Sequence, residues 1–149
     1  MHATTKPMLV LFIAMALGAG CATSPGMRDA DRLALYEQHA GPPVPSFRYL
    51  SISGWTPLGD SALAVWTRPS EAYLLTLSGS CPDLKFANAI SLSSQFRTVH
   101  ARFDRVLPIG PGPNMSIACH IQEIRPLDVR GVRQAQREIR SEVREAQRD

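Results

Sequence analysis

The sequence contains none of the short motifs that identify common enzyme active sites. It lacks a nucleophile elbow (GxSxG), a zinc-protease motif (HExxH), a Walker-type phosphate loop and a dinucleotide fingerprint (GxGxxG). Its three cysteines lack the CxxC spacing of a structural zinc site. These absences remove the usual grounds for predicting catalysis. We therefore expect no cofactor and no metal ion, and we favour a non-enzymatic role.

Neither sign of charge dominates the chain. Sixteen Lys and Arg residues oppose 13 Asp and Glu residues, which gives a formal net charge of +3, and aromatic residues make up 7%. A nucleic-acid-binding surface needs basic side chains clustered on one face, with aromatic side chains among them. The composition gives no sign of such a surface, so we expect no nucleic-acid partner.

The apolar segment near the start is too short to cross a bilayer as a helix, which takes about 20 residues. This segment, MLVLFIAMAL, covers residues 8–17 and follows a start whose only charged side chain is Lys6. Small residues at 18–20 precede Cys21. A cationic start, a short apolar segment and small residues before a cut are typical of a secretory signal peptide, which we assign to residues 1–20.

Cys21 and the residues before it resemble the lipobox of bacterial lipoproteins. The lipobox usually has Leu three residues before the cysteine, whereas here Gly18 holds that place and Leu17 lies one residue earlier. The resemblance implies that the Cys21 thiol carries a diacylglyceryl group and anchors the chain to a membrane. Ala22 rather than Asp follows the cysteine, which favours the outer membrane, facing the periplasm. The alternative is an ordinary cut near Cys21 that releases a soluble exported protein.

The two remaining cysteines, Cys81 and Cys119, are expected to pair. An exported chain folds in an oxidising compartment, where two leftover thiols tend to form a disulfide. The alternative is a zinc site made by these cysteines with His120 and His100, although the spacing of the four residues matches no common zinc motif.

The first half of the chain after residue 20 contains a short helix and a β-hairpin. Residues 30–39 suit a helix that buries Leu33 and Tyr36, and the proline-rich stretch 41–45 ends it. The runs 62–67 and 71–77 are joined by a short turn with proline in its second position, which predicts a hairpin. Both runs are apolar on both faces, as is typical of central strands.

Further strands are expected on both sides of this hairpin. The candidate strands are residues 47–55, one or two strands within 98–109, and 115–124, whereas residues 84–92 are ambiguous. In the strand 115–124, Ile117, Cys119 and Ile121 share a face, which we expect to point inward. The fold class is therefore mainly β, a small sandwich or partly closed barrel of about five or six strands, with a C-terminal α-helix.

The chain is thus divided into four parts. Residues 1–20 are the signal peptide, 21–45 the lipid anchor and a tether with the short helix, 46–127 the β-rich domain, and 128–149 an amphipathic helix.

The helix over 128–149 carries three separate stripes on a helical wheel. Val132, Ile139 and Val143 lie on the apolar face, with arginines that include Arg133 and Arg140 on one flank and glutamates on the other. One interpretation is a partner helix that binds an envelope protein or a second copy of this chain. The alternative is a solvated helix whose apolar strip lies on the sheet.

Aromatic and histidine side chains supply the remaining candidate sites. Trp55, Trp66 and Tyr73 lie in or near the hairpin and are candidates for a ligand pocket, or else belong to the core. An undetected active site could form if a histidine met an acid in space. The candidates are His39, His100 and His120 with Asp60, Asp83 and Asp104.

Three stretches resemble a family of uncharacterised lipoproteins of Gram-negative bacteria, a domain of unknown function. They are residues 54–77, 81–84 and 117–128. The resemblance implies export, lipidation and two cysteines in the mature domain, and it implies no activity. The expected function is therefore that of a cell-envelope lipoprotein that binds or scaffolds another envelope component. The alternatives are a carrier of a small apolar ligand and an envelope enzyme.

Overall fold

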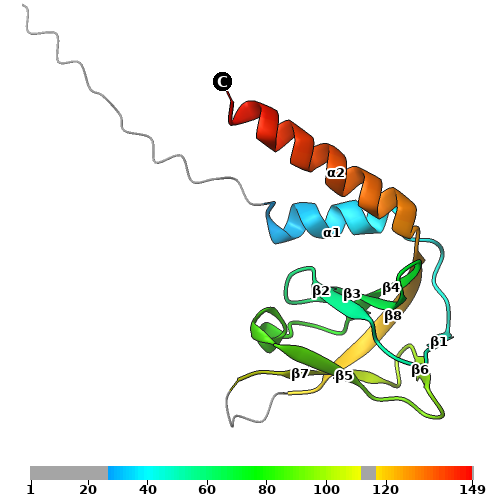
Figure 1. Ribbon diagram of the computed structural model, residues 1–149. Helices are drawn as coiled ribbons and strands as arrows, with labels where there is room; N and C mark the ends of the chain where they lie inside the picture. Colours follow the sequence, from blue (N-terminus) through cyan, green and yellow to red (C-terminus); the bar gives the residue numbers. More distant parts are fainter. Residues whose placement is uncertain (1–26, 112–116, 149) are drawn as a thin grey trace, which may run out of the picture.

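A six-stranded antiparallel sheet with the strand order β2-β3-β4-β8-β7-β5 forms the centre of the computed structural model, which describes residues 27–111 and 117–148 (Figure 1). Its strands are β2 (Gly54–Pro57), β3 (Ala62–Arg68), β4 (Glu71–Leu77), β5 (Ala89–Leu92), β7 (Arg105–Ile109) and β8 (Cys119–Leu127). A two-stranded sheet pairs β1 (Ser46–Arg48) with β6 (Thr98–His100). The helices are α1 (Asp29–Gln38), the 3₁₀ helix η1 (Pro82–Phe86) and α2 (Val129–Ala146). The fold is thus mainly β with a C-terminal helix, as expected, and the six-stranded sheet is open rather than closed.

The expected hairpin is formed by β3 and β4, which lie in the middle of the sheet. Leu63 faces Leu75 across the pair, and Val65 faces Tyr73. The two faces of the hairpin enter different cores, because successive side chains of a strand point to opposite sides. This confirms the prediction that both strands are apolar on both faces.

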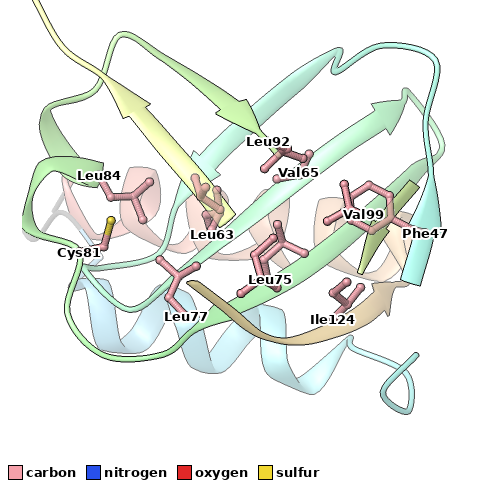
Figure 2. Packing of buried hydrophobic residues seen from close by; sticks show 12 residues of the cluster. Phe47, Leu63, Val65, Leu75, Leu77, Cys81, Leu84, Leu92, Val99 and Ile124 are labelled. Atoms are coloured by element: carbon pink, nitrogen blue, oxygen red, sulfur yellow. The ribbon is translucent and has the colours of Figure 1, made fainter. Parts of the chain in front are cut away.

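The first core lies between the hairpin and the strands that curl over one of its faces (Figure 2). Leu63, Val65, Leu75 and Leu77 contribute from the hairpin. The elements that cover them supply Phe47, Leu84, Leu92, Val99, Val106, Ile121 and Ile124. Side chains from nearly every strand fill this core, so the small two-stranded sheet and η1 are both parts of the same packed body.

The second core lies on the opposite face of the hairpin, under α1 and α2 (Figure 1). Its buried members are Leu35, Tyr36, Leu58, Ala62, Ala64, Leu74 and Val132. The expected helix over 30–39 is therefore an integral layer of the domain. The apolar strip of α2 also reaches this core, since Val132 is buried and Ile139 packs against it.

Strand β8 contains an irregularity that changes which side chains face the first core. The pairing with β4 shifts between Thr76 and Leu77, so that Thr76 faces Glu123 whereas Leu77 faces Ile121. A bulge of this kind adds a residue to one strand and interrupts the alternation of its side chains. As a result, Ile121 and Ile124 are both buried in the first core, although they are three positions apart in the sequence.

Two of the expected strands differ from the structure. The run 47–55 is not one strand, because it divides into β1 and β2, and Leu50 between them is 75% exposed. The backbone leaves the β1–β6 pair after Arg48, where the Tyr49 N–H donates to the carbonyl of Arg97. The last strand begins at Cys119, not at residue 115, and Ile117 is 75% exposed instead of inward-facing. Residues 115 and 116 lie outside the described part.

The structure also settles two segments whose secondary structure the sequence left open. Residues 84–92 contain the end of η1 and then β5, and residues 98–109 contain two strands, β6 and β7. Short elements of this kind leave weak periodicity in a sequence, because a strand of three or four residues shows at most two alternations.

A disulfide joins Cys81 to Cys119, as the sequence predicts, with 6.0 Å between their Cα atoms. Cys81 is buried and immediately precedes η1, whereas Cys119 begins β8 and is half-buried. The bridge thus ties the loop that follows the central hairpin to the start of the last strand. Because both sulfurs are bonded to each other, the alternative of a zinc site built on these cysteines is wrong.

The start of α2 is packed tightly against the end of α1. Asp128 caps α2, because its side chain accepts a hydrogen bond from the Arg130 N–H at 3.1 Å. At Gly131, an added Cβ would collide with the imidazole of His39 and the carboxylate of Asp128. Any larger residue here would force the imidazole of His39 or the carboxylate of Asp128 to move.

We expect that removing the disulfide destabilises the domain by about 3–4 kcal/mol, since the two cysteines are 38 positions apart. Cys81→Ser and Cys119→Ser should each have this effect on the free energy of unfolding, measured by urea denaturation. The double variant should cost little more than either single variant, because both changes remove the same bond. Additive losses would show that the thiols stabilise the fold separately.

We expect that Gly131→Ala lowers stability by about 1–3 kcal/mol, because the new methyl group overpacks the contact with His39. Helix propensity alone predicts the opposite, a gain of about 1 kcal/mol. Thermal denaturation of the two proteins distinguishes the predictions. Arg137→Ala, on the exposed side of the same helix, is the matched control and should change stability little. A stabilised Gly131→Ala protein would contradict the close approach.

Candidate functional site

The predicted lipidation site, Cys21, lies outside the described residues, as do the signal peptide and the first part of the tether. Within residues 27–111 and 117–148, neither helix has the length and apolar character required to cross a membrane.

The three aromatic residues proposed for a ligand pocket divide between the two cores. Trp66 packs against the second core, where its ring meets that of Tyr36 edge-on with 6.2 Å between centroids. Trp55 and Tyr73 pack against the first core, and the Tyr73 ring stacks on Phe47 at 4.4 Å. These contacts are packing interactions of the kind that aromatic side chains make inside proteins. Trp55 and Trp66 also line one surface pocket of about 440 Å³, whereas Tyr73 is not in its lining.

The contact between Tyr36 and Gln136 links the two helices and gave no signal in the sequence. The Gln136 side-chain amide donates to the Tyr36 hydroxyl at 3.1 Å, across 100 positions of the chain. Burial raises the pKa of the Tyr36 phenol, so this hydroxyl stays protonated at physiological pH. The buried polar group therefore keeps its partner, and the hydrogen bond fixes α1 relative to α2.

The candidate partner residues of α2 have different surroundings. Val132 is buried, Ile139 packs against the second core and Val143 is half-buried. The Arg133 guanidinium donates to the carbonyl of Pro69 at 2.6 Å, so it fastens the helix to the β3–β4 turn. Arg140 is exposed. The first half of the helix thus belongs to the core, and the second half is the part available to a partner.

A groove of about 550 Å³ runs between α1 and α2. Its apolar lining consists of Met27, Ala34, Leu35, Ala135 and Ile139, and the acids around it are Asp31, Glu138 and Glu142. The acids come from both helices, and the lining of the groove includes no basic side chain. The Arg28 guanidinium donates to the Asp31 carboxylate at 2.9 Å, so the negative charge that the groove offers a partner comes from Glu138 and Glu142. The groove therefore combines an apolar floor with negative charge on the α2 side, which suits a segment that is apolar on one side and basic beside it.

One of the expected histidine–acid pairs forms, between His100 and Asp104. The His100 Nδ1 atom lies 3.4 Å from the Asp104 carboxylate. The same carboxylate accepts from the Ser93 hydroxyl at 2.6 Å and from the His100 backbone N–H at 2.7 Å. In a nucleophilic triad the histidine stands between the serine and the acid. Here the acid stands between the other two, so the arrangement holds a turn together and does not activate Ser93.

The other candidate histidines and acids lie in separate places in the described part of the chain. His120 is exposed at the start of β8, and His39 packs against Gly131. Asp60 accepts from the Ser80 hydroxyl at 2.8 Å, and Asp83 is exposed on η1. In the part of the chain that the structure describes, no three His, Cys, Asp or Glu side chains are grouped as metal ligands would be.

Comparison with known proteins identifies the family and nothing more specific. No curated protein and no solved structure matches this chain. The model of a family of unknown function, DUF6491, matches residues 3–143, and this match covers nearly the whole sequence. The chain therefore belongs to the DUF6491 family.

Proposed function

We propose that this protein is a cell-envelope lipoprotein that acts as a non-enzymatic binding module, anchored through Cys21 to the outer membrane and facing the periplasm. The order of the N-terminal residues supports export and lipidation. The Cys81–Cys119 disulfide is of the kind found in oxidising compartments. The family match begins at residue 3, so it includes the apolar segment and Cys21.

The observation that carries the binding role is the groove between α1 and α2. Glu138 and Glu142 line the groove from α2, and the apolar floor includes Ile139. A partner that fits this groove has an apolar stripe with basic residues beside it. The α2 helix of a second copy has this character, because its arginine flank borders its own apolar stripe.

The charges of α2 favour a parallel pairing of two copies. In a parallel pair of helices, the flank on one side of the apolar stripe faces the opposite flank of the partner. In the second half of α2, which is available to a partner, one flank is acidic and the other carries Arg140 and Arg144. Each acidic flank would then face an arginine flank, twice in a symmetric dimer.

The alternatives have weaker support. A carrier of an apolar ligand needs an internal cavity, whereas packed side chains from nearly every strand fill the first core (Figure 2). An enzyme needs an activated group, and the Ser93 hydroxyl donates to Asp104 rather than to a histidine. The surface of the domain is therefore the better place to look for its function.

We expect the mature chain to begin at Cys21 and to carry acyl chains. Full-length protein, expressed in a Gram-negative host and purified from its membranes, should show this in an intact-mass measurement. Cys21→Ala should lack the added lipid mass and leave the membrane fraction. A wild-type chain cut near residue 21 without lipid would contradict the anchor but leave the groove untouched.

We expect that reversing the charges on either flank of α2 weakens the dimer. Mixing a chain with a reversed acidic flank and a chain with a reversed arginine flank should restore pairing between the two. In the second half of α2, Glu138→Lys with Glu142→Lys makes the acidic flank mainly basic, and Arg140→Glu with Arg144→Glu makes the arginine flank acidic. Each variant alone should dimerise at least roughly tenfold more weakly, because like charges then meet. A mixture of the two should form a heterodimer. Sedimentation in density-matched detergent measures each case.

The matched control reverses two exposed acids outside the groove, through Glu37→Lys with Asp83→Lys. This variant should dimerise like the wild type. A wild-type chain that stays monomeric at high concentration would contradict self-association, and the basic partner would then have to be another envelope protein.

A further inference from the structure

Three arginines from separate segments line one cavity between the β3–β4 turn and the two-stranded sheet. The cavity has a volume of about 260 Å³. Arg48 comes from β1, Arg68 from the end of β3, and Arg97 from the turn before β6. They are far apart in the sequence, and the fold brings them together.

Among the described residues, Glu71 is the one acid that lines this cavity, and neighbouring groups already hold its carboxylate. Its carboxylate accepts from the Thr67 hydroxyl at 2.8 Å and from the Tyr73 hydroxyl at 3.2 Å. Arg68 also lies 3.6 Å from it. Burial and the neighbouring Glu71 raise the pKa of the Tyr73 phenol, which therefore stays protonated as a donor. Glu71 thus organises the floor of the cavity and pairs with only one of the three arginines.

Arg48 and Arg97 are left with positive charge that the protein does not neutralise. Among residues 27–111 and 117–148, neither guanidinium forms an ion pair or a side-chain hydrogen bond. Three guanidinium groups against one carboxylate give the cavity an excess of positive charge. Guanidinium groups match the geometry of phosphate oxygens and bind them through paired hydrogen bonds.

Arg97 lies in a tight two-residue turn that borders this cavity. Phe96 and Arg97 have φ angles of 50° and 59°, in the left-handed region that non-glycine residues rarely adopt. Hydrogen bonds hold the turn, since the Gln95 and Thr98 backbones bond to each other and the Tyr49 N–H donates to the Arg97 carbonyl. Positive φ at both central residues is the geometry of a type I′ turn, so this conformation belongs to the tight turn that places Arg97 beside the cavity.

One exposed apolar side chain lines the same cavity, and another follows in the turn that contains Arg97. Leu50 lines it, and Phe96, next to Arg97 in the chain, is 95% exposed. Basic residues beside exposed apolar side chains are typical of a surface that meets an anionic amphiphile.

We propose that this cavity binds a phosphate group, with Arg48 and Arg97 as the principal ligands and Arg68 beside them. The phosphate could belong to a lipid headgroup, with Leu50 and Phe96 against the lipid, or to a soluble phosphate ester. The site is separate from Cys21 and from the α2 helix, so it does not rest on the function proposed above.

The test measures two probes with the full-length chain carrying Cys21→Ala, so that a lipid on Cys21 cannot hold the protein on vesicles. Isothermal titration with glycerol phosphate, in a phosphate-free buffer, reports a soluble ligand. Co-sedimentation with vesicles of four parts phosphatidylcholine to one part phosphatidylglycerol, compared with pure phosphatidylcholine, reports a lipid headgroup. Arg48→Gln and Arg97→Gln should each weaken binding by roughly tenfold or more, because each removes charged hydrogen bonds. Arg137→Gln removes the same charge from the exposed face of α2 and should not.

Each outcome decides between the possibilities. If both probes bind, and only the cavity variants weaken the binding, the site is supported, and its phosphate can come from a soluble ester or from a lipid. Binding of the mixed vesicles alone, with the same dependence, assigns the phosphate to a lipid. If neither probe binds, or if Arg137→Gln weakens binding as much as the cavity variants, the proposal is overturned. The variants change exposed side chains, and an unchanged melting temperature would show that each is folded.

Discussion

The layers of this molecule depend on one constraint, which is that the β3–β4 hairpin is apolar on both faces. Burying a leucine side chain stabilises a fold by about 1.5–3 kcal/mol relative to leaving it in water. The hairpin has Leu63 and Leu75 on one face and Leu74 on the other, so both faces need a cover. The small sheet, η1 and the curled strands β5 and β7 supply one cover. The two helices, from opposite ends of the described chain, supply the other (Figure 1).

Strand β8 joins these layers, because it is hydrogen-bonded both to β4 in the sheet and to the segment that follows α1. One edge pairs with β4, and near its end the other edge receives the segment that follows α1. There the Gly41 N–H donates to the Pro126 carbonyl at 2.8 Å, and the Arg125 guanidinium donates to the carbonyls of Ala40 and Gly41. Since α2 starts directly after β8, both helices are fixed from the same strand. The groove between them therefore has a defined shape.

The sequence predicts the parts of this fold whose signals are local. The hairpin has regular alternation and a proline turn, and α2 has a long stretch without proline, so both could be recognised. The prediction failed at 47–55 and at Ile117 for different reasons. In the first case alternation continues through Leu50 although the backbone has left the pair of strands. In the second, the ladder begins later than the apolar pattern suggests.

The candidate sites were harder to predict, because they depend on residues that are distant in the sequence. The Tyr36–Gln136 hydrogen bond spans 100 positions, and nothing near either residue indicates it. The arginine cavity needs β1, β3 and the turn before β6 to be correctly placed, and each arginine alone resembles an ordinary surface residue. The flanks of α2 were visible on a helical wheel, but only the structure shows that the acidic flank borders a groove with α1.

The distribution of charge explains why composition alone gave so little information about binding. A net charge of +3 suggests a surface without a strong preference for partners of either charge. In the folded domain, however, Asp31, Glu138 and Glu142 gather at one groove, whereas Arg48 and Arg97 gather at a separate cavity. These charges nearly cancel in the net charge of the domain. They act separately in space, because salt screens the interaction between exposed charges beyond about 8–10 Å. Separate surfaces of this kind let one small domain present negative charge in one place and positive charge in another.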